Sequence, residues 1–302
     1  MTQTEALPPQ RGAKQAQKRA TPTIKRRRVG AQLRHYRDLA GLSSVAAARK
    51  VGMDNTRLAR VERGTYRISA AEVRDLATAY GVSDDVAISG IAEAAEEPAS
   101  VGWWHPYKDV AGQALLDYIA LESEAMRVQI WAPSMVLGLL QTPAYAREVI
   151  HTSVTPTIQD RLERLVALRI ARQQVLTRPG APLECEFLVP ESAFHTRFRG
   201  GPSVIKDQLR RLLDVSEAEH VTLRVVELAA PPHSGHVTFT NLFFRHPWRP
   251  LVSFDNQSGG NLAEDDRTVT NSVATFEQIA SLALSVDDSR KLITRYLEGT
   301  QK

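Results

Sequence analysis

The chain has 302 residues, of which 43% are hydrophobic and 24% charged, and it contains a single cysteine, Cys185. This length is typical of two domains, and the composition is that of a chain that buries a core. No apolar run approaches the roughly 18 residues of a membrane span, and no secretory signal pattern follows the basic N-terminus, so we expect a cytoplasmic protein with no membrane association. A lone cysteine also favours a reducing compartment. Cys185 lies in an alternating, strand-like run, which predicts a small buried side chain rather than a nucleophile.

Positive charge is concentrated at the front of the chain. Residues 1–28 carry eight Lys/Arg and one Glu, and residues 29–90 carry a net +2. Because the whole chain is +4, the rest carries a net −5. A basic front and an acidic back predict that the front meets a polyanion, for which charge alone allows DNA, RNA or an anionic membrane.

Residues 1–28 contain almost no hydrophobic side chain around which to fold, which predicts a disordered basic arm. The cluster Lys25, Arg26, Arg27 and Arg28 adjoins the first expected helix. It is interpreted either as a solvated tail or as an arm that contacts phosphates or the minor groove.

Residues 29–95 have the pattern of a compact all-α domain of five short helices. Val29, Leu33, Tyr36 and Ala40 repeat at spacings of three and four, which marks one apolar helix face. Polar residues that cap helix starts alternate with glycines that end helices, namely Ser43, Ser44, Asp54 and Ser69 with Gly41, Gly52, Gly64 and Gly81.

Residues 96–102 are expected to be a linker, because Pro98 and Ser100 interrupt the pattern. Residues 103–300 mix helical and alternating segments and predict an α+β or α/β domain. Its expected helices are 115–131, 142–150, 158–176, 204–214, 269–284 and 287–297. Its expected strands are 183–189, 221–228, 238–244 and 251–254.

The strongest local motif is GLSSVAAARKVGMDNTRLARVERG at 41–64, in which a short turn at Gly52-Met53-Asp54 joins two helices. This is the pattern of a helix-turn-helix, whose second helix lies in the major groove of DNA. Arg hydrogen-bonds guanine with two donors, Asn pairs with adenine, and Thr offers a hydroxyl and a methyl group. The candidate DNA-reading side chains are Asn55, Thr56, Arg57, Arg60 and Arg63.

Residues 29–90 resemble the Xre or phage-repressor type of helix-turn-helix domain. The resemblance rests on Ala48 inside the second helix, Gly52 in the turn, and the hydrophobe-Glu-X-Gly signature at 61–64. It implies that Ser44 touches phosphate, that Asn55, Thr56 and Arg60 face bases, and that the structural pair Glu62 and Arg37 forms between helices.

The stretch LGLLQTPAYAREVI at 137–150 resembles a box in the uncharacterised C-terminal domain of many actinobacterial Xre-type regulators. That resemblance implies an effector- or partner-binding role, since members are often encoded beside a small acidic protein. From the residues alone, the box has a plainer structural interpretation. Gly138 permits a chain reversal, Gln141 or Thr142 caps a helix, and Pro143 suits its first turn.

Together these patterns predict a sequence-specific regulator that binds double-stranded DNA, is not an enzyme, and needs no metal or cofactor. Three alternatives stay open. The chain is the DNA-binding, antitoxin-like half of a two-protein module; its C-terminal domain is an enzyme; or its arm binds RNA. The enzymatic candidates are His233, His236 and Asp255, which lie in Pro/Gly-rich loops.

We further expect a homodimer on an inverted repeat, because a single reading helix gives limited specificity. The fifth helix offers Val86, Ile88 and Ile91 as a dimer surface. The second domain offers Trp103, Trp104 and the expected helices 115–131 and 158–176, which are alternatively interpreted as its own core.

Overall fold

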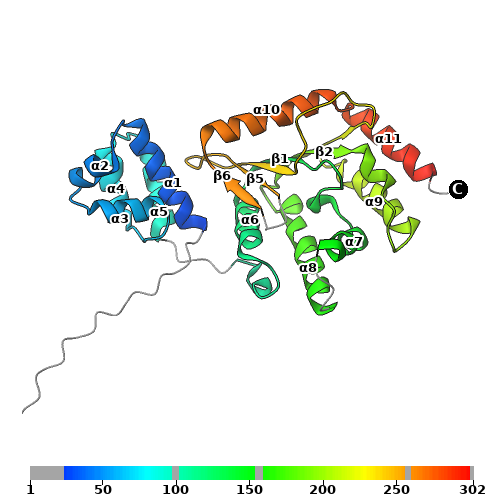
Figure 1. Cartoon of the computed structure of the whole chain (residues 1–302), viewed down its shortest axis with the longest axis horizontal. Coiled ribbons are helices and arrows are strands. Elements are labelled where there is room, and N and C mark those ends of the chain that lie inside the picture. Colours follow the sequence, from blue (N-terminus) through cyan, green and yellow to red (C-terminus); the bar gives the residue numbers. More distant parts are fainter. Residues whose placement is uncertain (1–23, 97–101, 154–158, 256–259, 300–302) are drawn as a thin grey trace, which may run out of the picture.

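The computed structural model describes residues 24–96, 102–153, 159–255 and 260–299. Its first part is a bundle of five helices, and its second part is a mixed sheet with helices on both faces (Figure 1). The predicted fold class, an all-α helix-turn-helix head followed by an α+β domain, is confirmed. The head helices are α1 (Ile24–Leu39), α2 (Ser44–Lys50), α3 (Asn55–Glu62), α4 (Ala70–Ala79) and α5 (Asp85–Glu96).

Polar side chains cap the starts of α2, α3 and α4. The Ser43 hydroxyl accepts a hydrogen bond from the Ala46 amide at 3.2 Å, and the Asp54 carboxylate accepts one from the Arg57 amide at 2.9 Å. Ser69 forms a capping box with Glu72. The glycines that follow helices adopt positive φ angles, a conformation that side chains disfavour; they are Gly41, Gly52, Gly64 and Gly81.

Six strands form the sheet of the second domain. They are β1 (Arg127–Trp131), β2 (Glu184–Pro190), β3 (Val221–Val226), β4 (Phe239–Phe243), β5 (Leu251–Phe254) and β6 (Asn261–Ala263). Their order in the sheet is β3-β2-β1-β4-β5-β6. β1, β2 and β3 are parallel, whereas β4, β5 and β6 pair antiparallel with their neighbours. In the register, Val128 of β1 stands between Cys185 of β2 and Leu242 of β4.

Helices cover the sheet unequally (Figure 1). One face packs against α9 (Pro202–Val215), α11 (Val286–Gly299) and the segment around residues 136–145, and it carries the larger core. The other face is covered by α10 (Asp266–Leu282), around Trp131 and Phe276. The remaining helices are α6 (Gln113–Glu124), α7 (Pro143–Ser153) and α8 (Gln159–Arg172), with short 3-10 turns at His105–Tyr107, Gly138–Leu140, Gln173–Thr177 and Glu191–His195.

Two predicted helices were wrong in extent. The expected helix 115–131 ends at Glu124, and residues 127–131 form the central strand β1 instead. Ala125 is extended at the boundary, and strand pairing on both sides outweighs the helical composition of the preceding residues. The expected helix 158–176 ends at Arg172, after which the chain tightens into a 3-10 turn. The short edge strand β6 was not predicted.

The predicted arm 1–28 was also wrong at its end, because α1 begins at Ile24 and includes the cluster Lys25–Arg28. The Ile24 side chain packs against the core of the second domain, which gives this turn of helix a tertiary contact. Residues 1–23 lie outside the described residues.

The backbones of α1 and α3 approach closely at Gly30. A Cβ added there would lie 2.3 Å from the Val61 carbonyl oxygen and 2.7 Å from that of Glu62. Such contacts are shorter than real Cβ atoms allow, so any larger residue must push the helices apart.

We therefore predict that Gly30→Ala lowers the stability of the head by about 1–3 kcal/mol. For a domain of this size, this corresponds to a melting temperature about 4–8 °C lower per kcal/mol. The matched control is Gly112→Ala, where the added Cβ meets nothing within 4 Å. Equal melting temperatures for the two variants, measured by circular dichroism, would show that the close approach is not a constraint.

Candidate DNA-binding surface

The helix-turn-helix is formed by α2 and α3. Ala47 and Ala48 of α2 and Leu58 and Val61 of α3 are buried in the core of the head. Gly52 makes the turn between the helices with a φ of +65°. Because the apolar face of α3 is fixed in this core, its opposite face is held toward solvent.

Three of the predicted base-reading residues lie on this outward face. Asn55, Thr56 and Arg60 are exposed, and Asn55 and Thr56 form the first turn of α3. The Ser44 hydroxyl donates to Asn55 Oδ1 at 2.7 Å, which ties the start of α2 to the start of α3. In the described part of the chain, the Arg60 guanidinium pairs with no carboxylate. The amide nitrogen of Asn55, the hydroxyl of Thr56 and the guanidinium of Arg60 therefore stay available to contact base edges.

Arg57 does not share this orientation, and its assignment as an outward DNA-reading residue is corrected. Its guanidinium forms a two-point ion pair with Glu72 of α4 and lies 5.5 Å from the centre of the Tyr66 ring. The hydrogen bonds from Arg57 lower the pKa of the Glu72 carboxyl. Glu72 already caps α4 through Ser69, so Arg57 joins α3 to α4 instead of extending into solvent.

Arg63 lies just past the end of α3. Its side chain is exposed, and its Nε donates to the Ala59 carbonyl oxygen at 2.9 Å. This bond satisfies one of the carbonyls that a helix end leaves without a partner. Arg63 remains at the surface, beside the residues proposed to contact bases.

The second half of the basic cluster faces the second domain, which corrects its assignment to a DNA-contacting arm. Arg27 pairs with Asp117, and Arg28 pairs with Glu124 at 3.2 Å, both on α6. The Arg28 side chain is only 5% exposed. Its guanidinium lies 3.8 Å from the centre of the Phe244 ring and 4.7 Å from that of Trp248.

Such a slot between two aromatic faces suits a guanidinium, because the rings attract a cation electrostatically. Burial lowers the pKa of Arg28 to about 10, so it is still charged at neutral pH. Arg27 and Arg28 therefore connect the head to the second domain. Lys25 and Arg26 line a cavity between the two domains.

A second contact between the domains involves the segment after β4, which the sequence analysis did not identify. Trp248 packs against the cores of both domains. His246 pairs with Asp84, which caps the start of α5, at 2.7 Å. Pro247 lies against Gly90 of α5. An aromatic residue next to prolines in the HPWRP stretch was the available signal.

The predicted pair Arg37 and Glu62 is present and joins α1 to α3. Arg37 Nε lies 2.6 Å from Glu62 Oε1, and Arg37 Nη2 lies 3.0 Å from Glu62 Oε2. The two side chains are 10% and 7% exposed, and Arg37 also donates to the Leu42 carbonyl oxygen at 2.8 Å. The hydrogen bonds to Glu62 raise the pKa of Arg37.

The signature at 61–64 thus has three roles at one helix crossing. Val61 is in the core, Glu62 holds Arg37, and Gly64 contacts the start of α1. A Cβ added at Gly64 would lie 2.6 Å from the Arg27 Cα, and the φ angle of Gly64 is +69°. Gly64 is therefore required both by its conformation and by the approach of α1.

The box at 137–150 is buried within the second domain. Gln141 is 2% exposed; it donates to the Val136 carbonyl oxygen at 2.7 Å and accepts from Arg169 at 2.8 Å. The Tyr145 hydroxyl accepts from the Val136 amide at 3.0 Å. Thr142 caps α7, which begins at Pro143, so these residues organise the chain reversal that joins β1 to α7.

The residues considered for catalysis either make contacts that hold the fold together or lie exposed at the surface. The His233 ring packs edge-on against Trp131 and accepts from the Gly235 amide, whereas His236 is exposed. Cys185 is a buried residue of strand β2, and burial raises the pKa of its thiol. Within the residues that the structure describes, no group of three or more metal-binding side chains is gathered.

We predict that Arg37→Met destabilises the head by about 3–5 kcal/mol, because the buried Glu62 carboxylate loses its partner. The double variant Arg37→Met with Glu62→Leu should recover part of this loss, since no uncompensated charge remains. Urea denaturation measures both free energies of unfolding. Arg34→Met is the matched control, because Arg34 is 64% exposed on the same helix and should change stability by less than about 1 kcal/mol. A double variant at least as unstable as Arg37→Met would contradict the prediction.

Comparison with known families agrees with this division of the chain. A model described as a helix-turn-helix domain matches residues 28–87, and one described as a domain of unknown function (DUF5753) matches residues 115–295. No curated protein matches the chain. None of the helices that the structure describes is long and apolar enough to cross a membrane. Since the second match covers more than half of the 302 residues, the chain belongs to the DUF5753 family and carries a helix-turn-helix domain at its N-terminal end.

Proposed function

We propose that this protein is a transcriptional regulator of the Xre type that binds double-stranded DNA sequence-specifically through α3. The observation that carries the proposal is the outward face of this helix. Asn55, Thr56 and Arg60 are exposed there, while Leu58 and Val61 fix the helix in the core. Arg and Asn are the side chains that best distinguish guanine and adenine in the major groove.

Ser44 supports this proposal from the neighbouring helix. Its hydroxyl contacts Asn55 and lies at the start of α2, where backbone amides favour an anion such as phosphate. The first turn of α3 and the start of α2 would then contact base edges and backbone together. Phosphate contacts fix the register of a protein on DNA, and base contacts select the sequence.

We propose further that the second domain binds a ligand or partner and is not catalytic. His233 and Cys185 have structural contacts, and His236 and Asp255 lie at the surface. The polar residues of the box serve the local chain reversal. A small acidic partner protein, including the partner of an antitoxin-like module, or a small-molecule effector would act through this domain.

The contacts between the domains supply a route for such control. Arg27 and Arg28 are on α1, and α1 also holds α3 through the pair between Arg37 and Glu62. A ligand that changes the contacts of α6 with α1 would therefore act on the helix that supports the reading helix. Control requires that the ligand favour one arrangement of the domains over another.

The sequence specificity of the protein is tested by selecting bound duplexes from a random library and footprinting the selected site. We predict that Arg60→Ala weakens binding to that site by about 1–3 kcal/mol and relaxes the preference at one base pair. The control is Arg74→Ala, which removes an exposed arginine from α4. An equal loss on selected and random duplexes for Arg60→Ala would show that Arg60 contacts no base.

We also propose a homodimer on an inverted repeat, with reading helices about 34–36 Å apart. Ile91, one expected dimer residue, is buried in the head, and Trp103 and Trp104 pack within the second domain. Val86 on α5 remains 71% exposed and is the candidate contact. Light scattering of the complex should give two chains per site, and Val86→Asp should weaken this assembly. A one-to-one complex on a site without dyad symmetry would rule out the dimer.

A further inference from the structure

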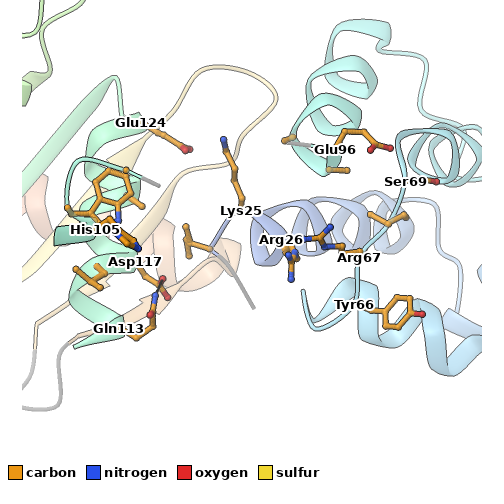
Figure 2. A pocket seen from close by; sticks show the side chains of 18 of the residues that line it. Lys25, Arg26, Tyr66, Arg67, Ser69, Glu96, His105, Gln113, Asp117 and Glu124 are labelled. Atoms are coloured by element: carbon orange, nitrogen blue, oxygen red, sulfur yellow. Dashed lines mark hydrogen bonds between the residues drawn. The ribbon is translucent and has the colours of Figure 1, made fainter. Parts of the chain in front are cut away.

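A cavity of about 710 Å³ lies between the head and the second domain. The head contributes the start of α1, the segment that joins α3 to α4, and the end of α5. The second domain contributes residues 102–108 and α6. Figure 2 shows the side chains of both domains around this space. The volume falls within the roughly 300–1,000 Å³ of small-molecule sites, and such sites are frequent between domains.

Part of the cavity wall is apolar. Ile68 comes from the segment before α4, and Leu116 and Ala120 come from α6. Trp104 adds an aromatic ring from the second domain, and Ala94 and Ala95 add small side chains from α5. These surfaces suit the apolar body of a ligand.

The carboxylates that line the cavity all have partners. Glu72 pairs with Arg57, Asp117 with Arg27, and Glu124 with Arg28. The Glu96 carboxylate accepts from the Ala70 amide at 2.8 Å.

Several cations also line the cavity. Lys25, Arg26, Arg67 and Lys108 all reach the cavity. Within the described residues, neither Arg67 nor Lys108 forms an ion pair with a carboxylate, and the Lys108 ammonium lies 3.5 Å from Nε2 of the His105 ring. Arg26 and Arg67 lie close together in Figure 2. Burial and the neighbouring charge of Arg67 lower the pKa of Arg26. Like charges brought together beside an apolar wall favour an anion between them.

We propose that this cavity is the effector site of the regulator and that it binds a small anion with an apolar, ring-bearing body. This inference rests on the proposed function. The anionic group lies beside Arg67 of the head, next to Arg26, and the apolar body extends from Ile68 of the head to Trp104 and Leu116 of the second domain. The ligand thereby bridges the two domains.

The cavity also reaches the reading helix. Arg57 of α3 lines it together with its partner Glu72. An anion in the cavity competes with the Glu72 carboxylate for Arg57, and this is a contact on α3 itself. The ligand contacts both domains and α3, so its binding free energy depends on how the two domains are arranged. This dependence is the requirement for allosteric coupling.

The test uses anilinonaphthalene sulfonate, a fluorescent aromatic anion, and its uncharged analogue N-phenylnaphthylamine, titrated into the full chain. We expect one saturable site for the anion and binding of the uncharged analogue that is roughly tenfold weaker or worse. Arg67→Gln should weaken anion binding about tenfold, since it removes one charged hydrogen bond. Trp104→Leu should weaken binding of both probes, since it removes the aromatic wall that the second domain supplies. Arg210→Gln, which removes an exposed arginine of α9, is the matched control and should have no effect.

Unfolding midpoints equal to that of the unchanged chain establish that the variants are folded. Absence of saturable binding, or binding unchanged by Arg67→Gln, overturns the site. An effect of Arg67→Gln without one of Trp104→Leu overturns the bridging of the domains.

The coupling is tested separately on the selected DNA site. Saturating anion should change the affinity for that site by about fivefold or more, and Arg67→Gln should abolish the change. An identical affinity with and without the anion overturns the coupling. If no duplex is selected at all, the proposed function fails, and the titrations still decide whether the cavity binds anions.

Discussion

The crossing of α1 over α3 determines how the head presents its reading helix. Gly30 and Gly64 bring the backbones together, and the buried pair between Arg37 and Glu62 fixes their relative orientation. The two glycine positions leave no space for a larger side chain, and the ion pair leaves no buried charge uncompensated. The distance and angle between the two helices are therefore tightly fixed. The same α1 begins against the second domain, where Ile24 and Arg28 are in contact with its core. One helix therefore supports the outward face of α3 at one end and the domain interface at the other.

The second domain has a different organising constraint. Several buried polar side chains hold the loops that join its strands and helices, and they do so through hydrogen bonds to backbone atoms or through ion pairs. Gln208 of α9 is fully buried; it accepts from the Thr142 amide at 2.8 Å and donates to the Leu140 carbonyl oxygen at 2.7 Å. Arg172 of α8 forms a two-point pair with the buried Glu122 of α6. Leaving any of these groups unpaired would cost about 1–3 kcal/mol or more, which explains why loop residues in this domain are so specific.

The head could be predicted closely because its signals are local. Ser43, Asp54 and Ser69 mark helix starts with side chains that bond backbone atoms three residues on. The pair between Arg37 and Glu62 was predicted from a family resemblance. The strand β1 was missed because its helical-looking neighbours extend to Glu124, and only pairing with β2 and β4 makes it a strand.

The errors in the candidate site have a common physical origin. Arg27, Arg28 and Arg57 are basic residues whose partners are remote in sequence. Asp117 and Glu124 follow about 90 residues later, and Glu72 follows on the next helix. An arginine on a helix has the same pattern whether it faces phosphate, solvent or a carboxylate, so periodicity does not distinguish these cases. The domain interface was missed for the same reason, since α1 contributes the polar Arg28 and Gln32 there beside Ile24.

The charge balance of the cluster at 25–28 has a consequence for the binding thermodynamics. Counted from the sequence, it offers four cations to a polyanion. In the folded chain, the charges of Arg27 and Arg28 are compensated internally by carboxylates of the second domain. Each cation that neutralises a phosphate releases condensed counterions and adds about 0.9 to the slope of log K against log salt for duplex DNA. Arg27 and Arg28 contribute nothing to that release. The slope of log K against log salt therefore reflects fewer cations than the sequence of this cluster contains.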